Sequence, residues 1–254
     1  MIYAVAALAC VAAGCGGKSD NQSQAQQEPA PTEVVDASTA GSITGSVTFE
    51  GTPPAFRPID MAAEPPCVKA NPKPVTPPVV ILGDHNQLAN VAVYIKSGLE
   101  KYKYDTPAAP VVLDQQGCMY TPRVLALMTH QTLQVKNTDP TSHNVHAVPH
   151  KNKQWNYSLP PGATPYETHF NRPETAITIM CNVHPWMRAF AFVFSHPDFQ
   201  VTDKTGLFDL KNVPPGTYTV EAWHERFGVQ DQTVTIGPKE SKTISFVFKP
   251  AETR

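Results

Sequence analysis

The stretch that decides the fold is CNVHPWMR, residues 181–188, which spaces a thiol, an imidazole and a thioether three residues apart. Residues 176–181 lead into it and residues 189–194 leave it, and both runs are short, apolar and bounded by turns, as β-strands are. A contiguous helix would not bring the three side chains to one point, whereas a loop between two strands can. The stretch therefore predicts a β-rich fold with a chemically active loop at a strand end.

Composition around this stretch favours the same fold class. The chain has 254 residues with 26 prolines but only 14 glycines, and 17% of its residues are charged. Proline is excluded from helix interiors and central ladders, so this composition suits short strands joined by stiff loops and excludes a helical bundle. Alternating runs at residues 43–49, 91–95 and 132–135 predict further strands. A formal net charge of −2 gives no cationic field to hold nucleic acid, and we expect none as a partner.

A second segment with a candidate ligand histidine lies upstream, in TDPTSHNVH, residues 138–146. His143 in this segment, joined with Cys181, His184 and Met187, completes two imidazoles, one thiolate and one thioether. A trigonal set of two imidazoles and a thiolate with a weak axial methionine is the pattern of a blue-copper site. Such a donor set suits both Cu(I) and Cu(II), so it favours one-electron transfer.

The four residue types and their order resemble the cupredoxins, and the short Cys-x-x-His-x-x-Met loop is similar to that of amicyanin. The resemblance covers roughly residues 105–195 and includes the His-Asn-Val triplet that starts at His143. It implies a Greek-key β-sandwich that binds one type-1 copper through His143, Cys181, His184 and Met187. It also implies that the backbone N–H of Asn144 steadies the Cys181 sulfur and that the Asn144 side chain ties the two ligand loops together.

Three nearby residues leave alternatives open. His146 and His150 could convert the site into a zinc or multi-histidine copper site, although strand alternation places His146 and His143 on opposite faces. Trp186, inside the ligand loop, either belongs to an apolar docking patch or covers the metal from water. The remaining histidines have no site-like spacing, and we expect them at the surface or at strand ends: His85, His130, His169, His196 and His224.

The cysteines divide by position. Cys67 and Cys118 lack metal-ligand spacing, so in an exported protein a disulfide between them is the default interpretation, with two separate buried thiols as the alternative. Cys181 is then a single thiol that would be exposed to oxidation unless a metal occupies it.

The first residues predict export. Residues 1–14 contain an apolar run of signal-peptide length, too short to span a membrane. With Cys15 at its end, the run resembles a bacterial lipoprotein signal, which implies a lipid-anchored protein of the periplasm or outer membrane; the alternative is a plain cleaved signal. Residues 15–40 are rich in Ser, Gln and Pro and predict a flexible linker.

The rest of the chain divides into two predicted domains, a copper domain with an N-terminal β extension at residues 41–195 and a small β domain at residues 196–254. The segment NVPPGTYTV, residues 212–220, resembles the carboxypeptidase regulatory-like, or prealbumin-like, sandwich family. We interpret this second domain as a packing or docking module.

Together these patterns predict an exported blue-copper protein that exchanges one electron with another redox protein, such as a c-type cytochrome. Four protein donors leave no open coordination position, so we expect no enzyme activity. Two alternatives remain: a protein that stores or delivers copper, and a structural or carbohydrate-binding module with a non-redox metal site.

Overall fold

The computed structural model describes residues 31–250, together with Met1, as an all-β structure of four sheets. The predicted signal peptide, Cys15 and most of the predicted linker therefore lie outside the described residues. Within residues 31–250, no helix is long and apolar enough to cross a membrane. The all-β fold expected from composition is confirmed.

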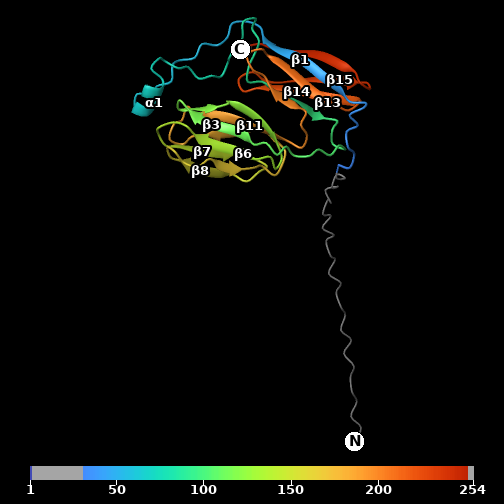
Figure 1. The fold of residues 1–254 in the computed structure, drawn as a ribbon, viewed down its shortest axis with the longest axis horizontal. Helices are drawn as coiled ribbons and strands as arrows, with labels where there is room; N and C mark the ends of the chain where they lie inside the picture. Colours follow the sequence, from blue (N-terminus) through green and yellow to red (C-terminus); the bar gives the residue numbers. More distant parts are fainter. Residues whose placement is uncertain (2–30, 251–254) are drawn as a thin grey trace. The chain divides into compact units, whose positions relative to one another are not determined.

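Two of the sheets face each other and form what we name the site sandwich (Figure 1). One sheet has the order β5 (Val124–Met128), β11 (Arg188–Phe194), β10 (Glu174–Met180), β7 (His143–Val148) and β8 (Trp155–Leu159). The other has the order β4 (Met119–Thr121), β3 (Val111–Gln116), β6 (Leu133–Asn137) and β9 (Tyr166–Thr168). Their inner faces enclose a core that includes Leu113, Val135 and Ile179.

The other two sheets form the second sandwich. One has the order β13 (Leu207–Val213), β1 (Gly41–Phe49) and β16 (Ser241–Phe248). The other has the order β12 (Phe199–Val201), β2 (Ala92–Ser97), β14 (Gly216–His224) and β15 (Gly228–Ile236). Ile43, Val93 and Phe246 lie in a separate core between these sheets.

The strand pairing corrects the domain division expected from the sequence, which placed residues 41–195 in one copper domain. Strand β1 pairs in parallel with β16 and antiparallel with β13, and β2 pairs with β14. Both early strands therefore belong to the second sandwich, and the site sandwich is an insertion between β2 and β12. The physical reason is that the apolar side chains of β1 and β2 fill the second core. That this sandwich is related to the carboxypeptidase regulatory-like family stays a prediction.

The two sandwiches share a third apolar cluster. Phe192 and Phe194 of β11 point away from the site core and pack against Tyr94 of β2 and Trp223 of β14. Strand β11 is therefore covered on both faces, which explains why its sequence is a nearly continuous apolar run.

A long connection between β1 and β2 carries the only helix of the described residues, α1 (Pro65–Ala70), which lies at one end of the site sandwich (Figure 1). The predicted disulfide is confirmed: Cys67 of α1 is bonded to Cys118, in the turn between β3 and β4. Met61 and Cys67 are buried in the site core. We name residues 59–75 the cap segment.

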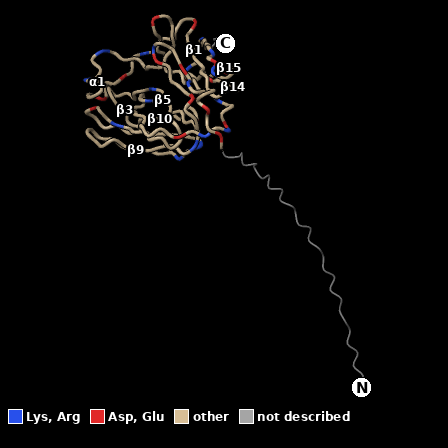
Figure 2. The backbone as a smooth tube through the Cα atoms, turned by 45° about the vertical axis from the view of Figure 1, so that its right-hand side comes forward, with Lys and Arg blue, Asp and Glu red and all other residues tan. Residues whose placement is uncertain are grey.

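Two of the histidines expected at the surface or at strand ends are buried, and one of them, His224, is the last residue of β14. His224 has no exposed surface and stacks on Phe227, and His196 is 8% exposed. Burial lowers the pKa of each to about 4, since a charged ring would lose its hydration. Charged residues of both signs are interspersed along the described chain (Figure 2).

Candidate metal centre

Strand pairing brings the predicted ligands to one end of the site sandwich. Cys181 directly follows β10, and His143 is the first residue of the neighbouring antiparallel strand β7, where Met180 is the register partner of His146. The loop to β11 then carries His184 back to the same point, and Met187 is the last residue of this loop before β11. Two hydrogen bonds close this loop: the Met187 N–H donates to the His184 carbonyl at 2.9 Å, and the Cys181 N–H donates to the Met187 carbonyl at 3.2 Å.

Three nitrogen and sulfur donors converge at this point. The Nδ1 atoms of His143 and His184 are 2.9 Å apart, and the Cys181 Sγ lies 3.7 Å from the His184 Nδ1. The ligand atoms of these three residues all lie within 4.8 Å of one another, and all three side chains are buried. This spacing lets one ion contact all three donors.

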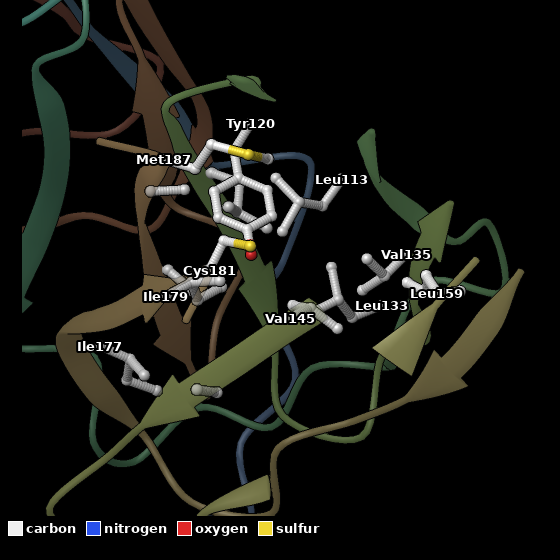
Figure 3. Packing of buried hydrophobic residues seen from close by; sticks show 14 of the residues in the cluster. Leu113, Tyr120, Leu133, Val135, Val145, Leu159, Ile177, Ile179, Cys181 and Met187 are labelled. Atoms are coloured by element: carbon white, nitrogen blue, oxygen red, sulfur yellow. The ribbon is translucent and has the colours of Figure 1, made fainter. Parts of the chain in front are cut away.

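Met187, the fourth predicted ligand, is fully buried in the same core cluster. Figure 3 shows its side chain in the same part of the cluster as Tyr120 and Cys181. The Tyr120 hydroxyl donates to the Asn144 carbonyl at 2.5 Å. The loop therefore adds a thioether to an otherwise closed, apolar end of the sandwich.

Asp139, which was not among the predicted site residues, contacts the Nε2 side of the His143 ring. One carboxylate oxygen lies 2.9 Å from the His143 Nε2, and the carboxylate accepts the N–H groups of Gly117 and Cys118 at 2.6 and 2.7 Å. Gly117 and Cys118 both have positive φ, at 64° and 54°, which turns these N–H groups towards the carboxylate. The sequence feature that could have identified Asp139 is its position in a turn, four residues before a candidate ligand histidine.

Hydrogen bonds and neighbouring charges shift the pKa values of His143 and Cys181 in opposite directions. Burial favours the neutral forms, but the Asp139 hydrogen bond and the neighbouring Cys181 raise the pKa of His143 to about 9. Burial likewise opposes ionisation of Cys181, yet hydrogen bonds from His143 and from the N–H groups of Asn144, Val183 and His184 lower the pKa of its thiol. The thiolate is the form that binds metals.

The pKa of His184 shifts in the opposite direction from that of His143. Burial and the charge of His143 lower the pKa of His184. A neutral His184 ring that holds an ion through Nδ1 carries its proton on Nε2. The Nε2 of His184 is a buried atom without a hydrogen-bond partner.

Asn144 links the two ligand segments, as the resemblance implied. Its Oδ1 accepts the Asn182 N–H at 2.7 Å and the Cys181 thiol at 3.3 Å, and its Nδ2 donates to the Asn156 Oδ1 at 2.8 Å. One amide thus fixes both the loop and the sulfur.

The structure separates His146 and His150 from the three converging donors. The His146 ring contacts the Asn182 and Gln154 side chains near the surface, and the His150 N–H donates to the Glu174 carboxylate. Trp186 is half-buried; its Nε1 donates to the Cys118 carbonyl at 3.0 Å, and its ring centroid is 5.2 Å from that of His184. Trp186 thus lies where it covers the site from one side, and a docking role stays a prediction.

Comparison with known proteins gives only partial likenesses. No family model matches the chain, and no curated protein matches it. Among solved structures, the copper-containing nitrite reductase from Thermus scotoductus SA-01 matches 40% of this chain and 25% of its own, at 19% identity and a TM-score of 0.32. A reduced mutant of amicyanin matches 40% of this chain and 97% of its own, at 21% identity and a TM-score of 0.30. A Cu(I) mutant of amicyanin covers the same shares at 22% identity and a TM-score of 0.29.

Proposed function

We propose that this protein binds one copper ion at His143, Cys181, His184 and Met187 and carries one electron. The observation that supports this most strongly is the buried convergence of two imidazole Nδ1 atoms and one thiol of lowered pKa, within 4.8 Å of one another. Copper held by such a donor set supplies a one-electron couple that needs little rearrangement. No substrate chemistry is proposed, since four protein donors leave no open position.

The residues around the donors would keep the site rigid during electron transfer. Asp139 holds the His143 ring at 2.9 Å, and Asn144 holds both the sulfur and the loop. Ordered outer partners of this kind fix ring orientation and raise ligand basicity. Burial of all the donors would also limit exchange of the ion with solvent, which favours an electron carrier over a protein that delivers copper.

We further propose that the partner is another redox protein, such as a c-type cytochrome, which approaches the ligand loop. Asn182, Val183 and Pro185 of this loop are exposed, and the Val183 side chain is 54% exposed. An apolar residue at the surface beside a buried redox centre suits a transient docking contact. Export and lipid anchoring at Cys15, in the periplasm or outer membrane, complete the proposal.

The test is spectroscopic. Metal-free protein receives one equivalent of Cu(II), and absorption and electron-paramagnetic-resonance spectra are recorded. We expect an intense visible thiolate-to-copper band with a narrow copper hyperfine splitting, lost in Cys181→Ser and retained in His146→Ala, the matched histidine control. A colourless protein that prefers zinc would contradict electron transfer and favour a structural metal site.

The methionine has its own test. Met187→Leu should keep the metal and the visible band but raise the reduction potential, because a weak axial ligand tunes the potential of such sites. An unchanged potential would remove Met187 from the ligand set.

A further inference from the structure

One polar atom of the site has no partner. His184 has no exposed surface, and its Nε2 makes no hydrogen bond within the described structure. A buried N–H without a partner costs about 1–3 kcal/mol, so such groups are rare and call for an explanation. Histidines that bind metals through one ring nitrogen usually donate the other N–H to a carboxylate or a carbonyl.

The cap segment brings a carboxylate to this atom. The Glu64 Oε2 lies 3.6 Å from the His184 Nε2, and in the part of the chain that the structure covers no other carboxylate lies within 4.0 Å of that nitrogen. The Glu64 side chain is 33% exposed, whereas the His184 ring is fully buried. Glu64 therefore lies between the ring and solvent.

The backbone of Glu64 is fixed by several independent contacts. Its carbonyl accepts the N–H groups of Cys67 and Val68 at 2.9 and 3.1 Å, at the start of α1. Cys67 is tied by its disulfide to Cys118, and the Asn71 side chain donates to the Cys67 and Gly117 carbonyls at 3.0 and 2.9 Å. The carboxylate is thus held beside the ligand loop by a covalently anchored segment.

The same turn serves both histidines. Cys118 anchors the cap segment that carries Glu64, and its N–H donates to Asp139, which faces His143 at 2.9 Å. Each imidazole therefore has its Nδ1 directed at the centre and its Nε2 directed at an acidic residue.

We propose that Glu64 is a positioning residue of the metal centre, whose carboxylate pairs electrostatically with the Nε2–H edge of His184 across 3.6 Å. The inference rests on the proposed function. With Asp139 on the other ring, Glu64 places a second negative charge behind the two imidazoles. Negative charge at this distance favours Cu(II) over Cu(I) and so lowers the reduction potential. The cap segment also closes the His184 edge of the site to solvent.

The experiment compares Glu64→Gln and Glu64→Ala with Glu50→Gln, an equal charge change at an exposed residue that pairs with Lys249. We expect Cu(II) affinity, measured by chelator competition, to fall about 10- to 100-fold in Glu64→Ala and less in Glu64→Gln, whose amide oxygen still accepts. Cu(I) affinity should change less, so the reduction potential rises in both variants. The visible band should remain, since all four donors are present.

A second measurement does not need copper. In ¹⁵N-labelled metal-free protein, the Nε2–H of His184 should exchange with solvent at least about tenfold faster in Glu64→Ala than in wild type, because the carboxylate no longer covers it. If the wild-type protein fails to bind copper but the two exchange rates still differ, the proposed function is overturned and the contact between Glu64 and His184 is not. Potentials, affinities and exchange rates equal to those of Glu50→Gln would overturn the role of Glu64.

Discussion

At the scale of single residues, the site depends on side chains that hold the donors rather than on the donors alone. Asn144, Asp139 and Glu64 come from three different segments, and each contacts a donor residue or its loop. Removing one of them should therefore loosen a donor without removing it.

Asn144→Ala should destabilise the metal-free protein by about 1–3 kcal/mol, because the Asn182 N–H and the Cys181 thiol both lose their acceptor. Urea unfolding measures this loss, and alkylation of Cys181 should become faster as the loop opens. Asn156→Ala, which removes only the partner of the Asn144 Nδ2, is the control. Equal effects of the two variants would contradict the linking role of Asn144.

A second residue-scale prediction concerns Asp198, a buried carboxylate whose two oxygens have no hydrogen-bond partner. Burial raises its pKa from 3.8 to about 7. Between these values the folded protein keeps a proton that the unfolded chain has released, so this residue's contribution to stability falls as pH rises through the window.

Asp198→Asn should therefore raise the melting temperature more at pH 8 than at pH 5. Thermal unfolding of metal-free protein at both pH values measures the difference. His196, whose Nδ1 is 3.9 Å from the Asp198 Oδ2, stays neutral at both, since burial lowers its pKa to about 4. A gain of equal size at the two pH values would show that the folded structure does not raise the pKa of Asp198.

At the scale of elements, the cap segment has little regular structure of its own and is held by its anchors. Its six-residue helix α1 is too short to be stable alone, and the disulfide to Cys118 closes a loop over a separation of 51 residues.

Replacing Cys67 and Cys118 together by serine should lower the free energy of unfolding by up to about 4 kcal/mol, the chain-entropy value for a loop of this length. Urea unfolding gives the loss, and limited proteolysis should cut within residues 59–75 before other sites. Cys181→Ser keeps the disulfide and is the control for removal of a thiol. A cap segment that stays resistant to protease in the double variant would mean that packing of Met61 suffices.

At the scale of the whole molecule, the two sandwiches are joined by an aromatic cluster and by a nearly buried ion pair. Arg123 precedes β5 of the site sandwich, and Glu225 follows β14 of the second; their side chains are 8% and 10% exposed. The Arg123 Nη2 donates to the Glu225 Oε2 at 2.7 Å, and its Nε donates to the other oxygen.

Glu225→Leu should therefore cost about 3–5 kcal/mol, since it leaves the Arg123 charge buried without a partner. Adding Arg123→Met should recover much of this loss, because no unpaired charge remains. Chemical denaturation of the two single variants and the double variant gives the coupling energy. Additive losses would mean that the pair does not couple the sandwiches.

Much of this architecture could be predicted because it is local. Short apolar runs bounded by turns predicted the strands on either side of the ligand loop, and the spacing of Cys181, His184 and Met187 placed them in one loop. The partners of β1 could not be predicted, since alternation shows which face is buried but not which strand lies alongside. Strand β11 illustrates the same limit, because an apolar run does not say that its outer face packs on Tyr94 and Trp223.

The outer partners of the site are non-local for a different reason. Glu64 precedes His184 by more than a hundred residues, and its position depends on the disulfide and on the route of the cap segment. Asp139 is only four residues from His143, but a carboxylate in a turn has many roles. The donors can be identified from their residue types in the sequence. The residues that support them, such as Glu64, are identified only from distances in the folded structure.

The pairing of β1 with β16 has a consequence for the order of folding. Ser42 and Ser241 hydrogen-bond across a separation of 199 residues, and β1 lies between β13 and β16. During synthesis, all strands of the site sandwich leave the ribosome well before β16. The site sandwich can therefore fold before β1 has both of its partner strands. Such long-range pairing is slow, because the chain loses the entropy of closing a long loop before the stabilising strand contacts form. We therefore expect the site to mature first, and the sandwich that surrounds it in the sequence to close last.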